Sequence, residues 1–270
     1  MEKKHGITLI RIVVLVTFLA MIAVNTLANT LPINGVTTGQ ISEFYPNLFT
    51  PAGLTFAIWG LIYALLGGYT LYQLEVFQDK TNNIKNKLLD NIGILFSISS
   101  IANATWIFSW HYGLIPLSII LMLIILICLI LINQEINTEK LSKKEYFFIR
   151  LPFSVYFGWI TVATIANATV LLVSLEWRGF GLAEEIWAVI IIFLGFIIGA
   201  TTMLKNRDVA YGLVIVWAYA GILLKHLLPE GFNGQYFEVI ITTAICMILL
   251  LFASIYLAIS KRIDSKHEQS

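Results

Sequence analysis

Few residues of this chain could carry chemistry, and most of them are amides and aromatic rings. Its two cysteines, Cys128 and Cys246, lie in separate apolar runs, which favours their reading as small buried hydrophobic residues. No nucleophile–base pair, phosphate-binding glycine loop or deeply placed acid is apparent. The histidines lack the spacing of a metal site: they are His5, His111, His226 and His267. His111 and His226 could approach a haem iron, but a solvent-facing position is the commoner one.

The pentapeptide IANAT occurs twice, at Ile101–Thr105 and Ile165–Thr169, each time within a long apolar run. An amide in hydrocarbon is costly unless it finds a partner, so Asn103 and Asn167 require an explanation. Both copies match a glycosylation sequon, but their intramembrane position argues against that use. We interpret the repeat as convergence rather than duplication, with two helices of the same direction presenting an amide at one depth.

Composition places these residues in a polytopic membrane protein. Hydrophobic residues make up 58% of the chain and charged residues 12%, and the mean hydropathy is +0.83. Soluble globular domains carry about 25% charged residues. A spanning helix needs about 20 mostly apolar residues. Eight stretches qualify: Thr8–Asn29, Ala52–Leu74, Leu89–Trp110, Leu114–Asn133, Phe148–Ser174, Ile186–Leu204, Val209–Leu224 and Phe237–Ser260.

The basic residues test this count independently. With eight helices and both termini inside, all of the 17 lysines and arginines except Arg178 and Lys225 fall on the inner side. The sequence therefore predicts an all-α, N-in/C-in bundle of eight transmembrane helices. Only KNRD at Lys205–Asp208 separates the sixth and seventh stretches, so a single broken hairpin is the alternative there. The long outer connection NTLPINGVTTGQISEFYPNLFTP could form a lid.

Polar and large aromatic residues of four helices share one depth. Asn103 lies roughly 20 Å into the third helix and Asn167 roughly 28 Å along the fifth, both toward the outer side. Asn25 lies at the outer end of the first helix, and Trp59 about two turns into the second. Trp106 shares a face with Asn103. We expect a cavity opening toward the outer leaflet, with aromatic walls and a few orienting amides.

Packing is the alternative explanation for the same residues. Asn, Ser and Thr in membrane helices often only bond neighbouring helices, at about 0.6–2 kcal/mol each. For Asn103 or Asn167 taken alone, the residue type does not decide between packing and ligand binding. Trp110 and Trp177 are better explained as members of the interfacial aromatic belt.

Three helices resemble a known family. The second reads FTPAGLTFAIWGLIYALLGG, in which Pro51 precedes Phe56, Trp59, Tyr63 and Gly67. The third reads NATWIFSWHYG and the fifth LPFSVYFGWITVATIANAT. These patterns resemble the TspO/MBR family of tryptophan-rich sensory proteins, which are related to the mitochondrial translocator protein. The resemblance covers roughly residues 7–175.

Two departures accompany the resemblance. Ala52 stands where the family often has a second proline, and Pro152 lies three residues too early. The last three helices lie outside the usual pattern. We therefore predict a divergent member with a TspO-like five-helix unit at 1–175, three additional transmembrane helices at 176–260 and a polar cytoplasmic tail at 261–270.

The resemblance implies a pocket for porphyrins and other flat hydrophobic ligands, and a sensory or regulatory role. It maps the pocket onto positions that the depth argument also selects, and residues of the same faces complete the set. The predicted ligand-binding residues are Phe56, Trp59, Tyr63, Asn103, Trp106, Trp159, Ala163 and Asn167. No cofactor is required, and porphyrin or haem is the candidate ligand.

Two other functions stay open at this stage. A transporter for a small hydrophobic or amphipathic molecule could use the last three helices as extra walls, although buried charges for ion coupling are missing. An intramembrane tetrapyrrole-modifying enzyme would need a reactive group, for which only Trp, Tyr63 and Tyr156 are candidates. The expected partners are the lipid bilayer and a small hydrophobic ligand, without nucleic acid, and a homodimer is a candidate assembly. Lysine-rich inner loops suit a bacterial plasma membrane.

Overall fold

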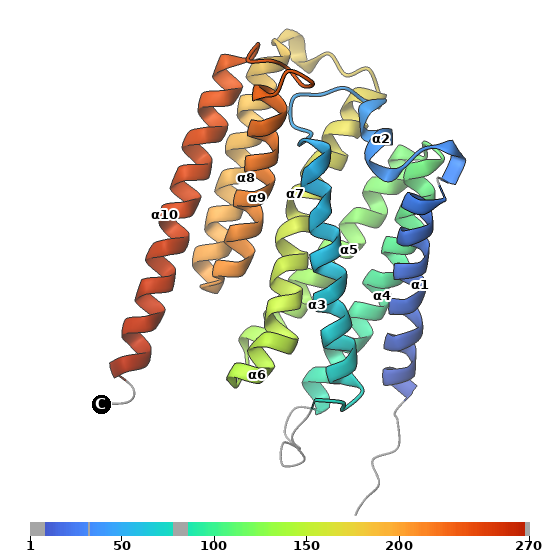
Figure 1. Ribbon diagram of the computed structural model, residues 1–270, viewed down its shortest axis with the longest axis vertical. Helices are drawn as coiled ribbons and strands as arrows, with labels where there is room; N and C mark the ends of the chain where they lie inside the picture. The colour runs from blue at the N-terminus through green and yellow to red at the C-terminus, as the bar shows by residue number, and fades with distance from the viewer. Residues whose placement is uncertain (1–8, 32, 78–85, 268–270) are drawn as a thin grey trace, which may run out of the picture. The chain divides into compact units, whose positions relative to one another are not determined.

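The computed structural model describes residues 9–31, 33–77 and 86–267, and none of these lies in a strand (Figure 1). Among them, eight helices are long and apolar enough to span a membrane. The predicted all-α membrane bundle with eight spans is therefore confirmed, whereas the N-in/C-in orientation stays a prediction. Parts of the sequence prediction lie outside the described residues: Lys3, Lys4, His5, Thr8, Lys80, Lys85 and residues 268–270.

The helices follow the predicted stretches closely. The long ones are α1 (Leu9–Thr30), α3 (Ile58–Gln73), α4 (Asn86–His111), α5 (Ile115–Asn137), α7 (Leu151–Ser174), α8 (Glu184–Asn206), α9 (Val209–Leu227) and α10 (Phe237–His267). A 3₁₀ segment, Gly53–Ala57, leads into α3, and a short π-helical segment, Tyr146–Arg150, leads into α7. The short helices are α2 (Thr38–Glu43) and α6 (Lys143–Glu145).

Local backbone chemistry sets the helix ends. Gly113, at a φ of 69°, turns the chain after α4, and Pro116 occupies the first turn of α5, where its missing N–H costs nothing. Arg207 is left-handed after α8, and the Asp208 side chain then caps α9 by accepting a hydrogen bond of 3.2 Å from the Tyr211 N–H. The sixth and seventh predicted stretches are thus separate helices.

The chain divides into two compact units, which are described separately below. Unit 1 comprises residues up to Ile41 together with Trp59–Phe157, and unit 2 comprises Ser42–Ile58 together with Gly158 onward. The first part of α7 therefore belongs to unit 1 and the rest to unit 2. The domain boundaries predicted at 175 and 260 stay predictions.

In unit 1, α4 packs against both α1 and α5. Tyr69, Phe96 and Phe153 form a buried aromatic cluster beside α4, with ring centroids 4.7–5.6 Å apart in edge-to-face geometry. Edge-to-face pairs of this kind add about 0.5–1.5 kcal/mol to the burial of the rings. This cluster fixes how α3, α4 and the start of α7 pack inside unit 1.

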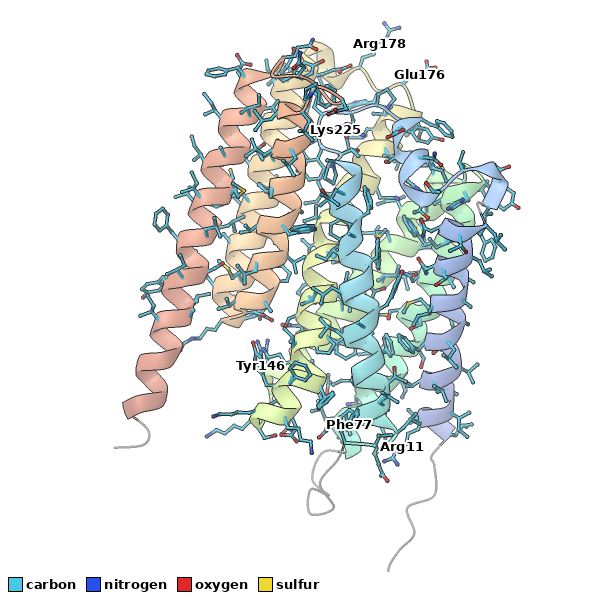
Figure 2. All side chains as sticks on the ribbon, viewed as in Figure 1. Arg11, Phe77, Tyr146, Glu176, Arg178 and Lys225 are labelled. Atoms are coloured by element: carbon cyan, nitrogen blue, oxygen red, sulfur yellow. The ribbon has the colours of Figure 1, made fainter. Side chains whose placement is uncertain are left out.

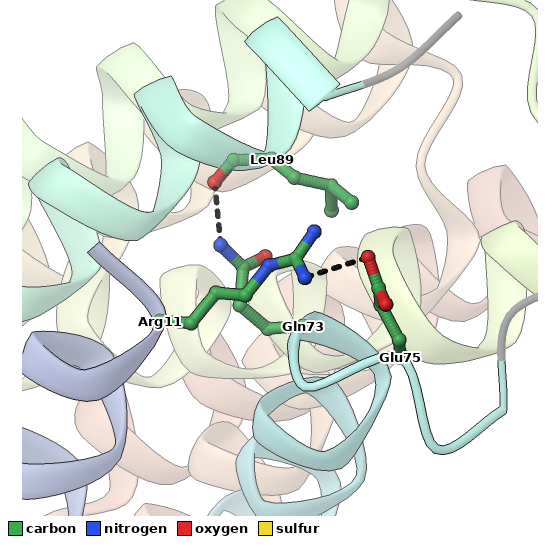
Figure 3. A network of polar contacts seen from close by, with 4 residues as sticks. All are labelled: Arg11, Gln73, Glu75 and Leu89. Carbon is green, nitrogen blue, oxygen red and sulfur yellow. Dashed lines mark hydrogen bonds and ion pairs between the residues drawn. The ribbon is translucent and has the colours of Figure 1, made fainter. Parts of the chain in front are cut away.

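A polar network ties three chain segments of unit 1 together (Figure 3). Arg11, in the first turn of α1, is buried and forms an ion pair of 2.6 Å with Glu75, just after α3. Gln73 donates a hydrogen bond of 3.1 Å to the backbone carbonyl of Leu89 in α4. The start of α1, the end of α3 and the start of α4 are therefore joined by polar contacts.

In unit 2, α10 packs against α8 and α9, and the segment before α3 packs on α9. The Ala52 N–H donates to the Gly221 carbonyl at 3.0 Å, and the Trp217 indole donates to the Thr55 carbonyl at 2.9 Å. Gly221 is required at this contact because a Cβ there would collide with the Thr55 side chain. The residues just before α3, from Ala52 to Thr55, are thus fixed to α9.

Charged side chains lie at helix ends, and apolar ones cover the helix faces. Figure 2 shows Arg11 at one end of its helix in unit 1. In unit 2 it shows Glu176 and Arg178 beyond the end of α7, and Lys225 in the last turn of α9. Large apolar side chains such as Leu19, Ile120 and Phe252 are exposed between these ends. Such faces suit hydrocarbon rather than water.

We expect Glu75→Gln to destabilise the protein by about 1–2 kcal/mol, because it leaves the buried Arg11 guanidinium without its counter-charge. The partial exposure of Glu75 keeps the effect below that of a fully buried pair. Glu176→Gln is the matched control, since Glu176 also has a positive φ but is exposed. Denaturant unfolding in detergent micelles measures both, and equal effects would contradict a stabilising role for the ion pair.

We expect Gly158→Ala to destabilise the protein by about 1–3 kcal/mol through overpacking. An added Cβ would lie 2.9 Å from the Tyr211 carbonyl oxygen and from the Val214 Cβ. Gly60→Ala is the control, because its Cβ would meet no atom within 4 Å. That change should stabilise α3 by about 0.5–1 kcal/mol. A higher melting temperature for both variants would show that helix propensity, not packing space, decides.

Candidate functional site

The aromatic residues predicted for the site in unit 1 each belong to a stacked pair. Trp59 and Tyr63 of α3 are stacked, with ring centroids 5.4 Å apart at 20°. Tyr156 of α7 meets Trp59 edge-on, with a centroid distance of 6.1 Å. On α4, Trp106 stacks on Trp110 at 5.5 Å and 21°. The one-turn spacings along α3 and α4 produce both stacks, since side chains three or four residues apart share a face.

Asn103 joins three elements of unit 1 through hydrogen bonds. The Asn25 amide of α1 donates to Asn103 Oδ1 at 2.7 Å, and Asn103 Nδ2 donates to the Tyr156 hydroxyl oxygen at 3.2 Å. Asn25 Nδ2 also reaches the Met21 carbonyl at 2.9 Å. All three linked side chains are buried. Asn103 therefore bonds neighbouring helices, as the packing explanation predicts.

Three other polar atoms of unit 1 are buried without a hydrogen-bond partner among the described residues. They are the Tyr63 hydroxyl, the Ser100 hydroxyl and the Trp106 indole nitrogen. Ser100 and Trp106 lie one turn before and one turn after Asn103 on α4. A buried polar group that makes no hydrogen bond costs about 1–3 kcal/mol. These atoms are hydrogen-bonding groups that the described residues of unit 1 leave unused.

The connection after α1 is fixed to the end of α4. Trp110 Nε1 donates to the Thr38 carbonyl at 3.1 Å, and His111 Nδ1 lies 2.9 Å from the Ile33 carbonyl. A carbonyl only accepts, so Nδ1 carries a proton, and His111 Nε2 meets the Thr38 hydroxyl at 3.0 Å. Asn34 donates to the His111 carbonyl at 3.1 Å. The segment predicted as a lid thus contains 3₁₀ and α-helical turns with specific contacts.

Two sequence-based expectations are wrong at these positions. His111 and His226 are buried rather than solvent-facing. His226, in unit 2, lies 2.9 Å from the Leu48 carbonyl through Nε2 and packs against the Phe232 ring. Trp110 is buried and hydrogen-bonded, so it is not a simple belt residue. Each of these side chains binds a loop carbonyl from a distant part of the sequence, which helix periodicity does not reveal.

The remaining predicted site residues belong to unit 2. Phe56 and Trp159 meet edge-to-face with ring centroids 5.8 Å apart. Ala163 is half-buried one turn further along α7, and Asn167 is buried one turn beyond it. The prediction that these residues bind ligand stays a prediction.

Three residues of this candidate site were not among the ligand-binding residues predicted from the sequence. Asn25 and Tyr156 complete the hydrogen-bonded chain of Asn103, and Ser100 supplies one of the unused hydroxyls. The signal for Asn25 was present, because it is an amide within an apolar helix. Ser100 gave none, since serine is common in packed membrane helices.

The described residues hold no group of three or more His, Cys, Asp or Glu side chains that could bind a metal ion. Cys128 and Cys246 are free and buried, as their apolar surroundings predicted. The chemistry available beside Asn103 is therefore hydrogen bonding and aromatic stacking.

Comparison with known families agrees with this architecture. A family model described as TSPO-like protein matches residues 11–257. The chain belongs to the TSPO-like protein family. The match extends past the motif resemblance at 7–175 and includes most of the last three spanning helices. No curated protein and no solved structure matches the chain.

We expect the amides of Asn25 and Asn103 to be energetically coupled. A double-mutant cycle with Asn25→Ala and Asn103→Ala should give a coupling of about 0.6–1.7 kcal/mol, because either change alone removes their shared hydrogen bond. Unfolding in micelles measures each variant. Asn29→Ala provides the control, since the Asn29 amide donates only to the backbone of Asn25. Additive effects of the two single changes would contradict the coupling.

Proposed function

We propose that this TSPO-like membrane protein binds a planar hydrophobic ligand, such as a porphyrin, beside α3 and α4 of unit 1. Its role would be sensory or regulatory. The observation that carries the proposal is the set of three buried polar atoms, on Tyr63, Ser100 and Trp106, that have no hydrogen-bond partner in the described part of the chain. Natural proteins rarely leave such groups unmet, and a bound molecule is one of the accepted reasons.

The aromatic groups supply the flat surfaces for such a ligand. Trp59 and Tyr63 are stacked on α3, and both remain partly accessible. A porphyrin ring gains apolar burial and offset stacking against indole and phenol faces. Flat apolar walls beside a few hydrogen-bonding groups are the usual composition of a small-molecule pocket.

The unused polar atoms define what else the ligand should carry. The Trp106 indole can only donate a hydrogen bond, while the Tyr63 and Ser100 hydroxyls can donate or accept. A ligand with acceptor atoms at its edge, such as the carboxylates of a porphyrin, would meet all three. Asn103 uses one N–H and one oxygen lone pair in the helix contacts, so it retains one N–H for a ligand.

The proposal includes two wider expectations from the sequence. A bacterial plasma membrane is the proposed location, because lysines and arginines concentrate on one predicted side. The residues Phe56, Trp159, Ala163 and Asn167 are proposed as further ligand contacts on the family resemblance, and their variants belong in the same binding measurements.

We expect Tyr63→Phe and Trp106→Phe to weaken protoporphyrin binding about 5- to 30-fold each, because each change removes a hydrogen-bonding group and keeps a ring. Tyr63→Phe should not lower the melting temperature of the free protein, since the lost hydroxyl has no partner among the described residues. Trp106→Phe should lower it, because that change also removes part of a buried ring that stacks on Trp110. Titration of the detergent-solubilised protein, followed by porphyrin absorbance and tryptophan quenching, measures binding.

Tyr69→Phe is the matched control, because the Tyr69 hydroxyl already contacts Gln73 at 3.4 Å within the aromatic cluster. Pyrene, which is flat but has no acceptor atoms, should bind equally to all variants. Quenching that never saturates and is equal in every variant would reduce the interaction to hydrophobic partitioning and overturn the proposal. Ligand flux into protein-containing vesicles would then favour the transporter alternative.

A further inference from the structure

Unit 2 contains a separate cavity of about 290 Å³. It lies between the segment that follows α2, the end of α7 and the start of α8, and all of its lining residues belong to unit 2. Its walls include Leu48, Phe49, Leu172, Trp177, Glu184 and Trp187. Ligand pockets typically measure about 300–1,000 Å³, so this cavity suits a small molecule.

Two indole rings form an angled wall of this cavity. The Trp177 and Trp187 centroids are 4.8 Å apart with the ring planes at 61°. The Trp187 N–H is already used, since it donates to the Gly179 carbonyl at 2.7 Å. Trp187 therefore offers its π surface rather than its polar edge. Indole faces carry negative electrostatic potential and attract cations within about 6 Å of the ring centroid.

One carboxylate and one guanidinium border the cavity, those of Glu184 and Arg178. Glu184, in the first turn of α8, lines the cavity and is exposed. Arg178 also borders it, but its side chain extends away from the helices in Figure 2. The Asn47 amide is occupied, because its oxygen accepts from the backbone N–H groups of Phe49 and Thr50 and its nitrogen donates to the Tyr45 carbonyl.

The loop that carries Trp177 is held in an uncommon conformation. Glu176 and Phe180 have φ values of 52° and 53°, and Gly179 has a φ of 58°. For a bulky residue such as Phe180, this is a genuine outlier. Strained backbone of this kind concentrates at ligand sites. A Cβ at Gly179 would collide with the Trp187 indole, so the glycine is needed for the present ring position.

From these observations we propose that the cavity beside Trp177, Trp187 and Glu184 binds a small organic cation with an apolar body, such as a quaternary ammonium compound. The indole faces hold the charge by cation–π attraction, and the carboxylate of Glu184 adds a counter-charge. This site is independent of the proposed porphyrin site in unit 1.

The test compares two probes of the same shape and different charge, phenyltrimethylammonium and its neutral carbon analogue tert-butylbenzene. Calorimetric titration of the detergent-solubilised full chain should give saturable binding that is tighter for phenyltrimethylammonium. We expect Glu184→Gln and Trp177→Leu each to weaken binding of the cation about fivefold or more. Glu184→Gln should leave binding of tert-butylbenzene unchanged.

Glu185→Gln is the matched control, since the neighbouring Glu185 does not line this cavity. It should leave the affinity for phenyltrimethylammonium unchanged. Equal affinities for the two probes, or an equal effect of Glu184→Gln and Glu185→Gln, would overturn the proposal. Binding of benzoate that is lost in Arg178→Gln would instead assign an anion site. Protoporphyrin titration of Glu184→Gln should match the unchanged protein, so failure at either site is recognised separately.

Discussion

Hydrocarbon offers no hydrogen bonds, and this constraint governs both units of the protein. A polar side chain within a span must find a partner in another helix or accept a penalty of about 1–3 kcal/mol. Asn25, Asn103 and Tyr156 meet the constraint through one hydrogen-bonded chain. Tyr63 and Trp106 do not meet it within the described residues, and this contrast makes their surroundings a candidate binding site.

Burial inside the protein places the same demand on polar groups of the connections, which form specific contacts. Buried histidines hold loop carbonyls in both units, through His111 to Ile33 and through His226 to Leu48. Each such bond satisfies a ring nitrogen and a carbonyl at once. Ordered connections of this kind place aromatic residues such as Trp110 at defined positions at the ends of spanning helices.

The family match and the division into two compact units describe different properties of the chain. The first is a property of the sequence, and the second is a property of spatial packing. The family match continues through most of α10, so the last helices are part of the matched sequence. Spatial packing instead divides the chain within α7, near Gly158, where close approach of α9 leaves no room for a side chain. The two candidate sites use different chemistry, with hydrogen-bond donors beside stacked rings in unit 1 and indole faces beside a carboxylate in unit 2.

The sequence by itself determined the eight spans, because span length and hydropathy are local properties that follow from bilayer thickness. It also selected Trp59, Asn103 and Trp106, since polar and aromatic residues stand out in apolar helices. Only the tertiary structure decided which residues are the hydrogen-bond partners of these polar side chains. Asn103 bonds Asn25, 78 positions away in the sequence, and His226 reaches Leu48 across 178. Such pairs depend on how helices pack, and helix packing leaves no periodic signal in either segment alone.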